Sequence, residues 1–224
     1  MTARLFRFFF SLCLALTCGM PGAIGQLDTE FWFAAPEVWA NHGDQPILLR
    51  FSTLAEAAQV TVDQPANPAF PAQTLNIPAN GTQTLDLTPW IDDIENTPFN
   101  TVLSQGLHIT SDAPVTAYYE INHNLNPDIF ALKGASALGN EFYVPFQNYL
   151  DNYYTQSKAA IDLVATEDNT EITVVPTAAL VGYAAGVPFT ITLNAGETYA
   201  LRAANAQAAN HPAGTYITST APIA

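Results

Sequence analysis

An eleven-residue segment occurs twice in this sequence, at 106–116 and again at 214–224. Six of the eleven positions are identical, and Val115 in the first copy corresponds to Ile223 in the second. A separation of about 108 residues is the length of a small domain rather than of a solenoid repeat. The repeat therefore predicts two related modules in tandem, an organisation more typical of binding than of catalysis.

The two copies differ at their C-terminal ends. The first copy continues through 117–122, whereas the second stops at Ala224. We therefore expect the second module to be truncated at its C-terminus, and the chain to be a fragment of a longer protein.

Short apolar runs with period-two alternation dominate both halves, and they are rich in β-branched and aromatic residues. This pattern is typical of strands and not of helices. The expected strands of the first module are 30–34, 46–52, 58–63, 74–77, 82–87, 106–110 and 115–121; those of the second are 141–146, 160–165, 171–175, 189–193, 198–202 and 215–218, with a short one at Ile223. These strands predict an all-β fold of two antiparallel β-sandwich-like modules, each of about 100 residues; a propeller-like ring is the alternative.

Further segments correspond between the modules in the same order. Residues 51–53 match 164–166, and the turn at 79–82 matches a turn one residue shorter at 194–197. We expect positive φ at the turn glycines, Gly81 and Gly196. Pro114 and Pro222 are expected to separate two strands, because proline donates no hydrogen bond to a ladder.

The first 25 residues predict a secretory signal peptide. Arg4 and Arg7 precede an apolar stretch, and small residues lead to a cleavage position after Gly25. A lipoprotein signal with Cys18 as the lipidated residue is the alternative. Cleavage removes both cysteines, and an exported chain without disulfides favours a bacterial surface or secreted protein. Beyond the signal we expect a first module at 26–125, a connecting segment at 126–137 and an incomplete second module at 138–224.

The mature chain is strongly acidic, with four basic residues against twenty acidic ones. Such a surface repels nucleic acid and anionic membranes, so neither is an expected partner, and no membrane insertion is expected after signal removal. Asp92, Asp93 and Glu95 form the one tight acidic cluster, but they lack the spacing of a dedicated calcium loop. We expect no bound metal, with calcium at this cluster as the alternative.

The sequence contains no catalytic constellation. No pair of histidines has zinc-ligand spacing, and Ser136 in 134–139 has one residue too many for a nucleophile elbow. We therefore expect no catalytic residues, no cofactor and no enzymatic activity.

Aromatic and amide residues gather in one loop of the second module, with one aromatic residue at the matching place in the first. Flat rings beside amides are suited to sugar or protein recognition. The candidate ligand-binding residues are Tyr149, Tyr153, Tyr154, Asn148, Asn152 and Trp39. The alternative interpretation is that these rings cap the ends of the modules.

Several phrases of the second module are similar to a known family. The runs 138–143, 164–174, 193–199 and 214–224 resemble, in this order, the N-terminal domain of IgGFc-binding protein. The resemblance is strongest over 138–224 and weaker over 27–122, and His211 to Gly214 departs from the family's usual phrase before the last strand. The resemblance implies a large extracellular protein of adhesin or mucin-associated type and supplies no catalytic residues.

These observations lead to one functional hypothesis with two alternatives. We expect a non-enzymatic extracellular binding or adhesion module of a larger secreted or cell-surface protein, with a host or environmental glycan or glycoprotein as a possible partner. The alternatives are an accessory carbohydrate-binding region of a secreted polysaccharide-active enzyme and a structural spacer. The sequence leaves the ligand and the oligomeric state open.

Overall fold

The computed structural model describes residues 26–39, 41 and 43–224 of this chain. Its strands account for 47% of the residues and its helices for 8%, and every strand pairing within the sheets is antiparallel, which confirms the all-β class. The expected signal peptide, residues 1–25, lies outside the described residues. No helix in the described part of the chain has the length and apolar character needed to cross a bilayer.

Seven strands of the first half form one sheet that curls into a nearly closed barrel-like shape. They are β1 (Leu27–Phe33), β2 (Ile47–Thr53), β3 (Ala58–Asp63), β4 (Gln73–Ile77), β5 (Thr82–Asp86), β7 (Leu107–Ile121) and β8 (Asp128–Leu132). The order is β4-β3-β7-β2-β5, with β1 and β8 both paired to β7. Strand β8 lies within the expected connecting segment, as does the 3₁₀ turn η3 (Gly134–Ala137).

The fifteen-residue strand β7 organises this sheet. Its first part, up to Ser111, pairs with β3, and its second part, from Val115 onward, pairs with β2. On its other side it pairs with β1 and then with β8. The expected break at Pro114 is therefore wrong. Pro114 lies between the β3 and β2 pairings, where a missing N–H interrupts neither ladder.

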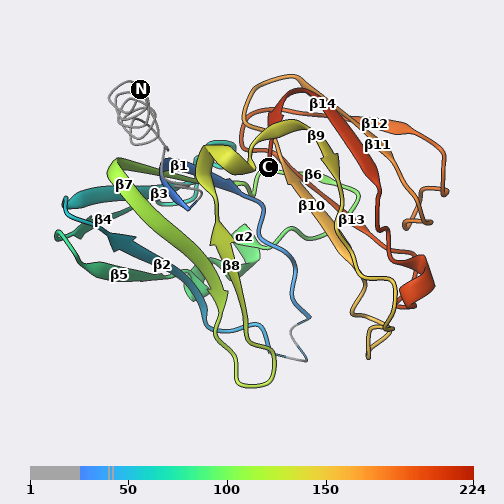
Figure 1. Cartoon of the computed structure of the whole chain (residues 1–224), viewed down its shortest axis with the longest axis horizontal. Helices are drawn as coiled ribbons and strands as arrows, with labels where there is room; N and C mark the ends of the chain where they lie inside the picture. Colours follow the sequence, from blue (N-terminus) through green and yellow to red (C-terminus); the bar gives the residue numbers. More distant parts are fainter. Residues whose placement is uncertain (1–25, 40, 42) are drawn as a thin grey trace, which may run out of the picture.

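The second half contains two smaller sheets. One has the order β12-β11-β14-β9 and the other β10-β13-β6. Their bounds are β9 (Gly139–Tyr143), β10 (Ala160–Val164), β11 (Thr170–Val175), β12 (Phe189–Leu193), β13 (Thr198–Arg202) and β14 (Tyr216–Ile223). Strand β14 runs through Pro222, so the break expected there is wrong for the same reason as at Pro114. Strand β6 (Val102–Leu103) comes from the first half of the sequence, yet it pairs with β13 (Figure 1).

The pairing registers of the two halves coincide. Val60 pairs with Ser111 and Leu75 in β3, and Ile172 pairs with Ser219 and Ile191 in β11. These positions correspond if β7 aligns with β14, β3 with β11 and β4 with β12. The same alignment relates β1 to β9, β2 to β10 and β5 to β13.

The registers also correct two details of the sequence alignment. Thr53 pairs with Val115 and Ala165 with Ile223, so 52–53 correspond to 164–165, one residue away from the expected match. Likewise Thr82 corresponds to Thr198. The two turns therefore have equal length, and Asn80 in the first corresponds to Gly196 in the second. Asn80 has φ of 54° and Gly196 of 79°, whereas Gly81 is not among the residues with positive φ. The positive φ expected at Gly81 therefore belongs to Asn80, a residue type that tolerates this region.

Each half has its own apolar core. The first is built around Phe31, Phe51 and Tyr119 from the central strands. The second is built around Ile172, Leu193 and Leu201. Between the halves runs the segment from the 3₁₀ turn η2 (Thr88–Trp90) and the short helix α2 (Ile91–Ile94) to β6, which carries the chain onto β13.

Candidate ligand-binding pocket

A pocket with a cavity volume of about 890 Å³ lies where the two halves meet. Three chain segments line it: the residues after β1, the turn between β7 and β8 with β8 itself, and the long loop between β9 and β10. Ala160 and Arg202, at the adjoining ends of β10 and β13, also line it. The pocket therefore depends on how the halves pack, and neither half forms it alone.

The first wall, at 36–39, is fixed by contacts with the segment after α2. The backbone N–H of Asn96 donates to the Ala35 carbonyl at 3.0 Å, and the Val38 N–H donates to Glu95 Oε1 at 3.2 Å. Glu95 is 7% exposed, and burial raises its pKa to about 7. These bonds place Glu37 and Trp39 beside the cavity.

The second wall is the loop 147–158, which is held by its own side chains. Gln147 Oε1 accepts the backbone N–H groups of Tyr149 and Leu150 at 2.7 and 2.8 Å. Asp151 Oδ1 accepts the Ala208 N–H at 2.7 Å, and the Asn152 N–H donates to the Ala206 carbonyl at 2.8 Å. Polar anchors of this kind shape a loop that has few apolar contacts.

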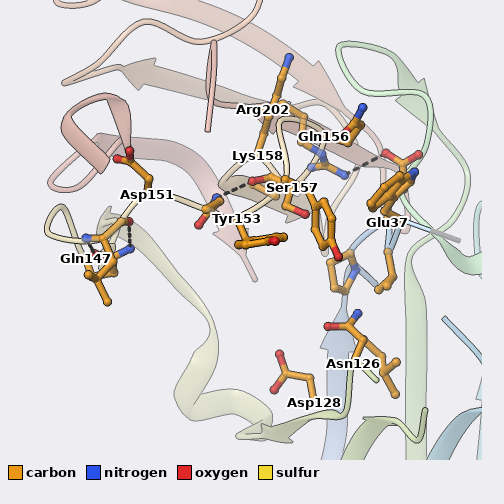
Figure 2. Close-up of a pocket in the computed structure, with 18 of the residues that line it drawn as sticks. Glu37, Asn126, Asp128, Gln147, Asp151, Tyr153, Gln156, Ser157, Lys158 and Arg202 are labelled. Carbon is orange, nitrogen blue, oxygen red and sulfur yellow. Dashed lines mark hydrogen bonds and ion pairs between the residues drawn. The ribbon is translucent and has the colours of Figure 1, made fainter. Parts of the chain in front are cut away.

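Aromatic rings from both halves meet in the pocket. The centroids of Trp39 and Tyr154 lie 5.1 Å apart with ring planes at 61°. The centroids of Tyr154 and Tyr153 lie 4.7 Å apart with planes at 85°. Figure 2 shows Tyr153 on one side of the hollow and Asn126 and Asp128 on the opposite side.

A buried ionic group closes the pocket at its base. Arg202, with 7% of its side chain exposed, donates through Nη1 to Asp162 Oδ1 at 3.0 Å and lies 3.7 Å from Glu37 Oε2 (Figure 2). Its Nη2 also donates to the Asn96 carbonyl at 3.4 Å. Burial raises the pKa of Asp162 to about 6, although Arg202 and Asn96 act in the opposite direction. This guanidinium joins the two halves, because Glu37 and Asn96 come from the first and Asp162 from the second.

Four of the six residues named from the sequence line the pocket: Trp39, Asn152, Tyr153 and Tyr154. Tyr149 and Asn148 do not line it, and Tyr149 is 90% exposed. Sequence reasoning missed the charged members, Glu37, Asp128, Asp151, Lys158 and Arg202. Glu37 lies two residues from Trp39, which is the one signal that pointed toward it. No group of three or more His, Cys, Asp or Glu side chains suited to a metal ion occurs in the described ranges.

Comparison with known proteins finds a family match in the second half of the chain. Residues 129–224 match the family model described as IgGFc binding protein, which confirms the resemblance seen in the sequence over that region. The match begins in β8 and covers β9 to β14 and the whole of the pocket's second wall. No curated protein and no solved structure matches the chain.

Proposed function

We propose, from the IgGFc-binding domain carried by residues 129–224, that this chain is a non-enzymatic binding or adhesion module of a larger exported protein. Domains of this family are typically extracellular binding domains. The signal peptide expected at 1–25 and the acidic surface both agree with export. The ligand in this proposal is a glycoprotein or glycan outside the cell.

The observation that carries the proposal is the pocket at the junction of the halves. It joins a concave shape to exposed rings and amide side chains, which is the composition of recognition sites in general. Tyr153 is 89% exposed, and a large ring left so open gains contact area when a partner covers it. In this proposal the two halves are related tandem modules, and the ligand contacts both.

An array of glycans and extracellular glycoproteins tests this function. The chain should bind a restricted set of array members, and Tyr153→Ala should weaken that binding about tenfold. Tyr149→Ala is the matched control, because Tyr149 is equally exposed but lies outside the pocket lining. Folded protein that binds no member of the array would refute the binding function.

Two alternatives make different predictions on the same array. An accessory region of a polysaccharide-active enzyme should bind polysaccharides alone, an interpretation favoured by the aromatic and amide side chains of the pocket. A structural spacer should bind nothing, and removal of 149–154 should leave cell adhesion unchanged.

A further inference from the structure

The aromatic side chains of the pocket pack edge to face against one another instead of forming one flat surface. The planes of Tyr153 and Tyr154 are nearly perpendicular, and Trp39 is inclined by 61° to Tyr154. A sugar ring stacks best on one broad aromatic face. A compact cation, by contrast, is attracted to the negative faces of several rings set at angles to each other.

The charges of the pocket favour the same kind of ligand. Asp128 and Asp151 are exposed lining residues, and neither forms an ion pair within 26–39 or 43–224. Each has Oδ1 occupied by a backbone N–H, from Ile129 and Ala208 respectively, which fixes the direction of the carboxylate. The positive charge of Arg202 at the base is already balanced by Asp162 and Glu37. An anionic ligand would face uncompensated carboxylates here.

We propose that this pocket binds an ammonium or guanidinium group carried by a basic side chain of a protein partner. The cation enters between the Tyr153 ring and Asp128, which Figure 2 shows on opposite sides of the hollow. The negative net charge of the chain, −14, attracts such a partner over a longer range. This inference rests on the proposed function and specifies the chemistry that the site recognises.

Lys158 gives the proposal a sharp internal test. It lines the same pocket, and no carboxylate partner is found for its ammonium group among the described residues. A cationic ligand is repelled by this charge, an anionic ligand is attracted by it, and a neutral sugar is indifferent to it. Removing the charge therefore reports the sign of the ligand.

The experiment is a titration of the whole chain with the N-acetylated and C-amidated peptide Gly-Gly-Lys-Gly-Gly, followed by NMR shifts, with the glutamine and arginine versions, blocked in the same way, beside it. The lysine and arginine peptides should bind at least tenfold more tightly than the glutamine peptide. Binding should weaken as salt rises, because the attraction is partly between exposed charges. Methyl glucoside serves as the neutral sugar probe.

Three pocket variants and two control variants locate the effect. Asp128→Asn and Tyr153→Ala should each weaken the lysine peptide about fivefold or more, and Lys158→Gln should strengthen it about threefold. Glu56→Gln and Tyr149→Ala are matched controls of charge and ring, both outside the pocket lining, and should change nothing. The Asp128→Asn variant keeps the oxygen that accepts the Ile129 N–H, so its effect reports charge and not loop structure.

The outcomes separate this inference from the proposed function. Equal binding of lysine and glutamine peptides, or weaker binding after Lys158→Gln, overturns the cationic ligand. Binding of methyl glucoside through Tyr153 overturns it also, while leaving the binding function intact. Absence of binding to peptides, to the sugar and to the array overturns both.

Discussion

Strands β5 and β13 occupy equivalent positions in the two halves, yet their surroundings are opposite. In β5 four of five residues are exposed, whereas in β13 all five are buried. The cause lies outside the strands themselves. The chain between α2 and β6 lies on β13, where Leu103 pairs with Thr198 and the Asn100 N–H donates to the Ala200 carbonyl at 2.8 Å. No comparable segment is paired to β5 in the described structure.

The difference shows that strands at equivalent register positions are completed in different ways in the two halves. The first half stabilises itself around β7, and the second half is completed by a segment of the first. The charged residues differ as well: Arg50 on β2 lies in a partly exposed pair with Glu120, while Asp162 at the equivalent position on β10 is buried with Arg202. The contact between the α2–β6 segment and β13 thus completes the sheet β10-β13-β6, and Arg202 on β13 forms the base of the pocket.

The largest effect on stability should come from removing the Arg202 side chain, which pairs with Asp162. Arg202→Met leaves Asp162 buried without its cationic partner, which should cost about 3 to 5 kcal/mol of unfolding free energy. Urea unfolding followed by fluorescence and circular dichroism measures the loss. The loss of unfolding free energy in Arg202→Met should be greater at pH 8, where the Asp162 carboxyl is charged, than at pH 5, where it is protonated. Arg50→Met is the matched control, because that side chain is 43% exposed, and its loss should be far smaller. Equal losses would show that the two ion pairs have equivalent surroundings.

A second prediction concerns pH and Glu95, which anchors the first pocket wall. Below about pH 4.5 its carboxyl is protonated in both folded and unfolded chains, so it contributes no pH dependence. Between 4.5 and about 7 the unfolded chain loses this proton first, so folding becomes less favourable as pH rises. Glu95 should therefore lower stability at pH 8, relative to pH 4, by about 1 to 2 kcal/mol after allowance for partial solvation.

Glu95→Gln should remove this pH dependence, and urea unfolding at a series of pH values measures it. The glutamine keeps Oε1 as acceptor for the Val38 N–H, so the wall remains in place. Glu141→Gln, at an exposed position, is the control and should leave the pH profile unchanged. An unaltered profile for the Glu95 variant would show that this carboxyl is not buried in solution.

A third prediction compares two threonines at equivalent positions. Thr198 is fully buried and donates through Oγ1 to Asn96 Oδ1 at 2.7 Å, whereas Thr82 is exposed. Thr198→Val should cost about 1 to 2 kcal/mol because it leaves the buried amide oxygen without its donor. Thr82→Val should change stability by less than about 0.5 kcal/mol. Thermal unfolding of both variants side by side decides the matter, and similar shifts would contradict the asymmetry of β5 and β13.

The smallest effect concerns the equivalent turn positions at Asn80 and Gly196. Asn80→Ala should cost about 0.5 to 1 kcal/mol, since alanine lacks the side chain that makes this region accessible to asparagine. Asn80→Gly should remain within about 0.5 kcal/mol of the wild type in urea unfolding, because relief of the backbone and greater freedom of the unfolded chain oppose each other. A large loss for both variants would indicate a role for the asparagine side chain beyond its backbone conformation.

The local parts of the fold were predictable from the sequence. Strands at 58–63, 189–193 and 198–202 have the predicted bounds, because alternating or β-branched runs between turn residues specify them locally. Strands β6 and β8 were missed. The first is only two residues long, and the second lies in an asparagine-containing segment whose composition is typical of a connector. Both exist because a neighbouring strand offers an edge.

The candidate site also has residues whose clustering the sequence predicts and residues whose clustering it does not. Tyr153, Tyr154 and Asn152 are close in sequence, so their clustering required no knowledge of the fold. Asp128 and Arg202 lie far apart in the chain and meet only through the packing of the halves. Long-range placement of this kind has no sequence period that would reveal it. The family match over 129–224 likewise gives a resemblance for that region without pointing to the pocket.

Strand β7 also has a mechanical consequence. It is hydrogen-bonded to β1, β2, β3 and β8, two strands along each side. A force applied along β7 would have to shear both rows together, so the first half should give way in one abrupt step. The second half, with two separate sheets joined through β14, should lengthen in smaller increments. In a protein that tethers one surface to another, the first half would hold its shape while the second absorbs extension.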